Sequence, residues 1–218
     1  MSYFFTKKIS LRIQERIAGI ILILSMLAVF VAGTVFVQMN PYYPEGDQLN
    51  TTAGAYYCLH GNLSMLTKGG YIGLYEQQKG FMFLYEILFF IFGDFCYKVA
   101  GEFHVIFAVL TMWFGYRFVR LHFKRPSCCI LYCILMAVCF PFIIYLPYIY
   151  GDVPAIFFST VLFWALSEYG RSGQKRYIAA GAVASALALM CRMNTWIVLI
   201  AVCIGLILLT IQKKTYKP

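Results

Sequence analysis

Long runs of apolar residues, separated by short polar segments, organise this chain. A helix needs about 20 mainly apolar residues to cross a bilayer at a rise of 1.5 Å per residue, and six runs approach that length. A seventh run, 81–92, is shorter, contains Glu86 and is closed by Gly93 and Asp94. The six longer runs predict spanning helices at 17–37, 103–120, 128–148, 153–169, 177–191 and 195–211. The expected fold class is therefore all-α, a polytopic transmembrane helical bundle.

The positions of the basic residues indicate that the 81–92 run does not cross. If it stays on one side, four basic clusters fall on the same membrane face, and together they hold most of the 18 Lys and Arg residues. These clusters are Lys7/Lys8/Arg12/Arg16, Arg117/Arg120/Lys124/Arg125, Arg171/Lys175/Arg176 and Lys213/Lys214/Lys217. Since cytoplasmic loops carry an excess of Lys and Arg, this face is predicted to be cytoplasmic, with both termini on it.

Residues 38–102 then form a long outer loop between the first two crossings. Its segment 47–59 contains little Pro or Gly and predicts a short helix. Residues 80–92 predict an amphipathic helix in the membrane interface, with aromatic side chains in lipid and Glu86 turned to water or protein. We therefore expect juxtamembrane helices in this loop, within a single transmembrane domain that comprises residues 1–218.

Composition excludes a soluble fold. Of the 218 residues 61% are hydrophobic and 12% are charged, whereas about a quarter are charged in a soluble domain. The net charge of +9 is spread between the apolar runs, so nucleic acid is not an expected partner. A basic N-terminus before an apolar run resembles a signal peptide, but this run is about twice as long as a signal core, which predicts a retained anchor helix.

Metal-ligand patterns are weak in this sequence. Most of the eight cysteines lie in or beside apolar runs, where a thiol behaves as a small hydrophobe, and the three histidines are on different segments. No His or Cys metal site is predicted. A divalent cation at the outer carboxylates is the one cofactor left open, and so is a disulfide between Cys58 and Cys96, because spacing alone cannot establish it.

Two aspartates are the first candidates for chemistry. Asp47 follows a segment stiffened by Pro41 and Pro44, directly after the first predicted crossing, and Asp152 lies at the outer end of the third. Two carboxylates at one membrane face can serve one site, one as a base toward an acceptor hydroxyl and the other positioning it or a cation. The alternative is that they are solvated loop acids or helix caps, and Asp152 before Val153 and Pro154 does resemble a cap.

Basic residues on the predicted outer side are the second candidates. Arg192 lies between two apolar runs, where the cytoplasmic bias of cations disfavours it. Such a cation often pairs with a carboxylate or receives a phosphate, and the alternative is that it extends to lipid headgroups. Lys79 has the same two interpretations, with interfacial anchoring favoured.

The order of these motifs resembles a known family. Its elements are the apolar anchor, the proline-rich turn with Asp47, the segment 71–80 (YIGLYEQQKG), an interfacial run ending at Gly93, and the segment 150–155 (YGDVPA). The combination is similar to the N-terminal part of the GT-C superfamily of membrane glycosyltransferases. Within it, the protein mannosyltransferase and aminoarabinose transferase group, of the glycosyltransferase family 39 type, is the nearest in pattern.

The resemblance implies roles for particular residues. Asp47 would be the catalytic carboxylate and Asp152 its catalytic partner, with Arg192 near the donor phosphate. Tyr75, Glu76 and Lys79 of the 71–80 segment would bind substrate. Members of the group usually continue with further membrane helices, so we expect this chain to lack the C-terminal part of the family.

The predicted function follows from this resemblance. It is transfer of a sugar from a polyprenyl-phosphate-linked donor to an acceptor at the outer face of a bacterial cell membrane, with the donor and membrane lipid as partners. The acceptor is unknown. The alternatives are a multi-pass transporter or lipid flippase, and an inactive truncated membrane protein. The near absence of charge from the predicted helix centres argues against an ion-coupled carrier.

Overall fold

The computed structural model describes residues 2–40 and 43–215, and side chains are described except at 2–10, 208–210 and 212–215. Pro41 of the predicted proline-rich turn and Lys217 of the last basic cluster therefore lie outside the described residues. So do the side chains of Lys7, Lys8, Lys213 and Lys214. All regular secondary structure in the described ranges is helical, in agreement with the predicted all-α class.

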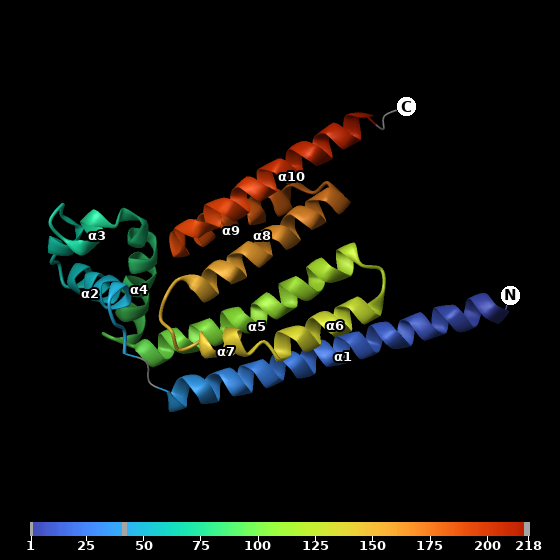
Figure 1. Cartoon of the computed structure of the whole chain (residues 1–218), viewed down its shortest axis with the longest axis horizontal. Helices are drawn as coiled ribbons and strands as arrows, with labels where there is room; N and C mark the ends of the chain where they lie inside the picture. Colours follow the sequence, from blue (N-terminus) through green and yellow to red (C-terminus); the bar gives the residue numbers. More distant parts are fainter. Residues whose placement is uncertain (1, 41–42, 216–218) are drawn as a thin grey trace.

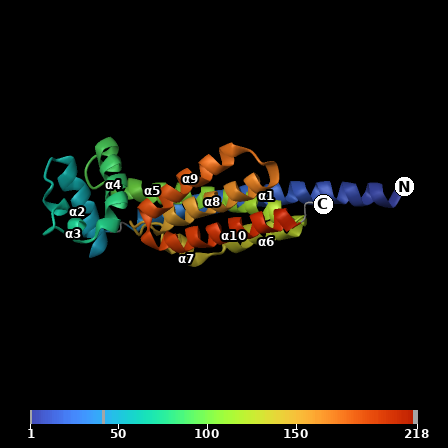
Figure 2. The same cartoon turned by 90° about the horizontal axis from the view of Figure 1, so that it is seen from above.

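Seven helices form an elongated bundle, and both cartoon views show them running along one common direction (Figures 1 and 2). They are α1 (Ser2–Met39), α5 (Tyr97–His122), α6 (Pro126–Ala137), α7 (Phe140–Ile144), α8 (Asp152–Ser172), α9 (Lys175–Cys191) and α10 (Trp196–Thr215). Helix α5 packs against α1, α6 and α8, and α8 packs along α9. Each predicted span overlaps one or two of these helices.

Three of these helices are long and apolar enough to cross a membrane. They are Leu11–Met39 of α1, Tyr97–His122 of α5 and Asp152–Ser172 of α8. Two shorter apolar segments, Pro126–Ala137 and Met193–Ile207, lie in the same bundle. The chain is an all-α integral membrane protein, and the count of six crossings stays a prediction.

The elements between α1 and α5 form a cap on one end of the bundle, which we define as residues 43–96. It contains α2 (Asp47–Leu59), α3 (Tyr71–Leu74) and α4 (Lys79–Phe92), with single 3₁₀ turns at Ser64–Leu66 and Glu76–Gln78. The helices predicted for 47–59 and 80–92 are α2 and α4. Helix α4 runs across the bundle direction in both views and packs against α2 (Figures 1 and 2).

Helix α4 has two apolar faces with different surroundings. Phe81, Tyr85 and Phe89 are buried in the core of the cap, and burial of a side chain of this size contributes roughly 1.5–3 kcal/mol. On the other face Phe83 and Phe90 are 51% and 77% exposed. An exposed aromatic face on a helix lying across the bundle end suits the predicted interfacial position.

The predicted helix 128–148 is interrupted in the structure. Helix α6 ends at Ala137, and α7 begins only at Phe140. Pro141 accounts for the break, because it has no N–H for the hydrogen bond to residue 137 and its ring clashes with that carbonyl. After α7 the chain passes through Pro147 to Tyr150 without regular structure, which carries it across the bundle end to the start of α8.

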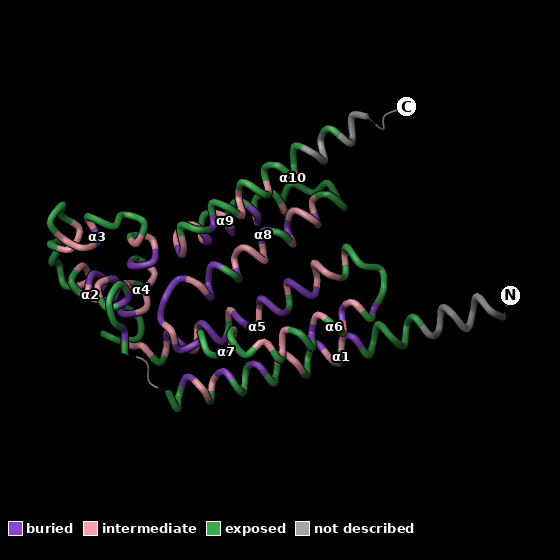
Figure 3. Tube along the Cα trace, viewed as in Figure 1, coloured by how far each residue is buried: buried purple, intermediate pink, exposed green. Residues whose placement is uncertain are grey.

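Buried residues concentrate where the bundle helices face one another (Figure 3). Val105, Ala108 and Met112 of α5 form one core with Val29 and Val37 of α1. Helix α10 is different, since most of its described residues are exposed. Residues of α8 and α10 also line two grooves, and one of these grooves includes Asp152 and Arg192.

Candidate functional site

Asp152 and Arg192 form an ion pair at the cap end of the bundle. The Arg192 Nε donates a hydrogen bond to Asp152 Oδ1 at 2.8 Å, and the two side chains are 32% and 30% exposed. Asp152 is the first residue of α8 and Arg192 follows the last residue of α9. The structure thus joins two of the residues singled out from the sequence, 40 positions apart.

A short turn brings these two helix ends together. Gly173, the residue after α8, adopts the left-handed conformation at φ 69°, which permits an abrupt reversal into α9. The antiparallel pair therefore returns Arg192 to the level of Asp152. Gly151 lies directly against the carbonyl oxygen of Cys191, and a Cβ there would overlap that oxygen.

A second glycine, Gly80, allows the cap to pack against the end of α9. A Cβ placed on Gly80 would lie 2.8 Å from the Cα of Met190, so the start of α4 packs directly on the end of α9. At Gly151 and at Gly80 a side chain would overlap the backbone of α9, so at both positions two backbones lie in direct contact. The ion pair is consequently set by three converging helix ends, those of α4, α8 and α9.

Tyr150 connects Arg192 to the cap. The guanidinium carbon of Arg192 lies 4.3 Å from the centre of the Tyr150 ring, a cation–π distance. The Tyr150 hydroxyl accepts a hydrogen bond of 2.5 Å from Gln78 Nε2. The ring is buried and meets Phe81 of α4 edge to face at 5.9 Å. Sequence reasoning assigned no role to Tyr150 or Gln78, although both lie inside the quoted motifs.

Asp47 lies on the cap side of this cluster. It is the exposed first residue of α2, and its carboxylate accepts a hydrogen bond from the Tyr71 hydroxyl. Burial, and then the adjacent Asp47 charge, hold the pKa of Tyr71 well above its usual value. Tyr71 is thus the partner of Asp47 within the cap.

The other predicted binding residues pair with one another. Lys79 Nζ donates to Glu76 Oε1 at 2.8 Å, with both side chains largely exposed. The Lys79 hydrogen bond lowers the pKa of Glu76. Tyr75 is 48% exposed, and its ring centre lies 4.7 Å from that of Tyr71. These residues lie in the cap with Asp47, and none of their described contacts involves the ion pair, so their binding role stays a prediction.

A groove of about 380 Å³ begins at the ion pair and runs between α8 and α10. It is charged at the ion pair, and farther along α8 its lining mixes apolar and hydroxyl side chains. The polar lining is Asp152, Ser159, Thr160, Arg192, Asn194 and Thr195, and the apolar lining is Ala155, Ile156, Phe163 and Val198. Such a groove can hold a ligand with a charged head and an apolar tail.

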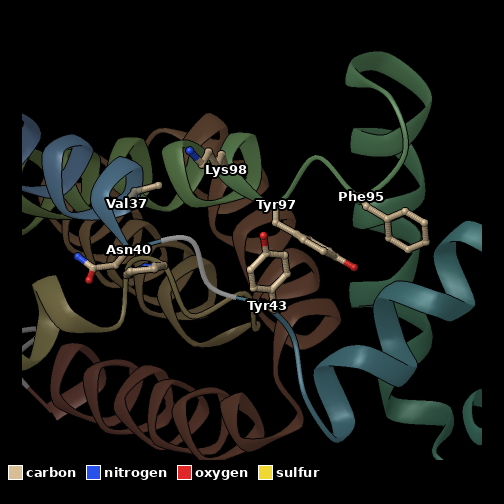
Figure 4. Close-up of a pocket in the computed structure, with 7 residues that line it drawn as sticks. Val37, Asn40, Tyr43, Phe95, Tyr97 and Lys98 are labelled. Carbon is tan, nitrogen blue, oxygen red and sulfur yellow. The ribbon is translucent and has the colours of Figure 1, made fainter.

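A smaller hollow of about 170 Å³ lies where the cap meets the bundle (Figure 4). Tyr43 and Tyr97 lie beside one another in it, with Asn40 at the end of α1 and Lys98 on α5. Its lining contains none of the predicted site residues.

Among the residues whose side chains are described, no three His, Cys, Asp or Glu side chains gather as a metal site. Asp152 instead engages Arg192. The two cysteines considered for a disulfide, Cys58 and Cys96, are both free thiols, and burial raises the pKa of each. The Cys96 thiol donates to the Leu88 carbonyl oxygen at 3.6 Å.

Comparison with protein-family models gives a match. A family model described as dolichyl-phosphate-mannose-protein mannosyltransferase matches residues 80–218. The matched part includes Tyr150, Asp152 and Arg192, whereas Asp47 and the 71–79 segment precede it. No curated protein and no solved structure matches the chain.

Proposed function

Because the chain belongs to the dolichyl-phosphate-mannose-protein mannosyltransferase family, we propose that it transfers a sugar from a polyprenyl-phosphate-linked donor to an acceptor at the outer membrane face. The family supports a membrane glycosyltransferase that uses a lipid-linked sugar. The carrier, the acceptor and the membrane face are our proposal. The observation that carries it is the Asp152–Arg192 pair at the mouth of an amphipathic groove.

Arg192 is our candidate for the donor phosphate. Asp152 engages only the Nε atom, and the terminal guanidinium nitrogens make no hydrogen bond to any described residue. Two parallel N–H groups match the oxygens of a phosphate, and a phosphate contact there would leave the tail of the donor over the groove. Asp152 fixes the direction of the guanidinium, so in this proposal it positions Arg192.

Asp47 is our candidate for the general base. Its carboxylate is exposed at the cap, held by Tyr71, and free to approach an acceptor hydroxyl. The acceptor oxygen would form its bond to the anomeric carbon as the bond from that carbon to the phosphate oxygen breaks. The proton of the acceptor passes to Asp47, and the polyprenyl phosphate leaves as an anion stabilised by Arg192. The transfer inverts the anomeric configuration.

Replacing Asp47 with Asn tests the base. The amide keeps the size of the side chain and cannot take the proton, so transfer from a polyprenyl-phosphate-linked sugar should be abolished in a membrane assay at matched expression. Glu45→Gln is the control, because Glu45 is an exposed acid two residues away. Turnover at the wild-type rate in Asp47→Asn membranes would remove Asp47 from the mechanism.

The purified protein separates this function from transport. Release of polyprenyl phosphate from the donor, with sugar appearing on an acceptor, supports the transferase. Movement of the intact donor across proteoliposomes, without cleavage of the sugar–phosphate bond, would instead support a lipid flippase.

A further inference from the structure

A second groove lies at the end of the bundle opposite the cap. It has a volume of about 520 Å³ and is lined by residues of α5, α8 and α10. Its apolar lining is Phe118, Leu121, Phe163, Leu166, Ala201, Val202 and Leu206. The rim differs in character, since His122, Ser167 and Arg171 lie there, where α5 and α8 end. Phe163 lines both this groove and the one that begins at Arg192.

The rim carries more positive charge than its acid can neutralise. Glu168 is buried, with 3% of its side chain exposed, and accepts two hydrogen bonds from Arg171, at 2.7 and 3.0 Å. Arg117 contacts the same carboxylate at 3.4 Å. One carboxylate thus faces two guanidinium groups, which leaves one unit of positive charge. Arg171, with 65% of its side chain exposed, and Arg117, with 39% exposed, share this charge.

Hydrogen-bonding groups and free space accompany this charge. His122 Nε2 lies 2.9 Å from the Ser167 hydroxyl oxygen at the rim. Two glycines, Gly170 and Gly205, line the groove, and a Cβ on either would meet no atom within 4 Å. The groove can therefore accept apolar chains without rearrangement.

We propose that this groove binds an anionic diacyl phospholipid, with its phosphate at Arg171, His122 and Ser167 and an acyl chain between α8 and α10. The excess positive charge selects an acidic headgroup, and the apolar walls select the chain. A polyprenyl tail alone would make no use of the charged rim. This lipid is neither donor nor acceptor of the proposed transfer, and its site faces the membrane leaflet opposite the cap.

Native mass spectrometry of the full chain tests the proposal, with phosphatidylglycerol and phosphatidylcholine of identical acyl chains as probes. The wild type should retain one phosphatidylglycerol more tightly than phosphatidylcholine. Arg171→Gln should weaken phosphatidylglycerol binding about fivefold, since one cation near a lipid surface contributes about 1 kcal/mol. Gly205→Leu should remove binding of both lipids by filling the groove.

Two matched variants serve as controls. Arg176→Gln removes an exposed arginine of the same bundle end that does not line the groove, and Gly19→Leu adds the same side chain to α1, where a Cβ also meets nothing within 4 Å. Both should bind phosphatidylglycerol like the wild type. Equal weakening by Arg171→Gln and Arg176→Gln, or unchanged binding in Gly205→Leu, would overturn the proposal. If Arg171→Gln does not fold, because Glu168 loses a partner, Gly205→Leu decides.

Discussion

Two side chains hold the guanidinium of Arg192, the carboxylate of Asp152 through Nε and the ring of Tyr150 through its face. The carboxylate fixes the plane of the group, and the ring covers one side of it. Tyr150 is itself held by Gln78. A flexible side chain is thereby held in one orientation before any ligand arrives, which lowers the entropy that phosphate binding would otherwise lose.

Replacing Arg192 tests its proposed contact with the phosphate of the donor. Hydrogen bonds to charged groups contribute about 1.5–3 kcal/mol, so Arg192→Gln should lower kcat/KM for the lipid-linked donor by roughly 10- to 100-fold. Arg192→Lys should lose less, because it keeps the charge and loses only the paired geometry. Arg176→Gln, at the other bundle end, should retain the wild-type value. Equal activity in all three variants would separate Arg192 from the donor.

Three helix ends, those of α4, α8 and α9, determine where the ion pair lies, and two glycines allow them to meet. Gly151 has ordinary negative φ of −70°, so its requirement comes from the adjacent Cys191 carbonyl and not from backbone conformation. A helix end displaced by the size of one methyl group would separate Asp152 from Arg192. The geometry of the site is thus a property of these elements as much as of the charged residues.

Gly151→Ala tests this close approach. The added methyl overlaps the Cys191 carbonyl oxygen, so the variant should lose roughly 1–3 kcal/mol of stability and most of its transfer activity. Thermal unfolding in detergent, together with the donor assay, measures both. Gly19→Ala is the reference, since its Cβ meets nothing within 4 Å and alanine favours the helix by up to about 1 kcal/mol. A Gly151→Ala protein as stable as Gly19→Ala would show that the helix ends tolerate separation.

The two ends of the bundle differ in structure and in charge. One end of the bundle carries the cap with α4 lying across it, and the turns from α5 to α6 and from α8 to α9 lie at the other (Figures 1 and 2). Several basic residues lie in these turns and in the helix ends beside them. Those residues are Arg120, Lys124, Arg125, Arg171, Lys175 and Arg176. Because basic loops favour the cytoplasmic side, this polarity predicts that the cap faces outward.

Cysteine labelling of intact cells tests the predicted orientation. Single cysteines at exposed Glu45 and Asn194 should react with a membrane-impermeant maleimide from outside, above the background of the native cysteines. Cysteines at exposed Lys124 and Lys175 should react only after the membrane is permeabilised. Labelling of Glu45 and Lys124 positions from the same side would contradict the six-crossing arrangement.

Much of the architecture could be predicted because it depends on local pattern. Apolar length identified the bundle segments, and low Pro and Gly content identified α2, since each property acts within one helix. The break at Pro141 could also have been predicted, because its missing N–H is a local fact. The pairing of Asp152 with Arg192 was only one of several interpretations of the sequence.

By itself, then, the sequence determined an all-helical membrane protein and the acids and bases available to it, and it predicted the segments that become helices. Only the tertiary structure decided which of them meet. The contact of Arg192 with Asp152 and Tyr150 requires the α8–α9 reversal and the close packing at Gly80 and Gly151. Such contacts join residues far apart in the chain, and their distances depend on how whole helices pack, a quantity that no local pattern contains.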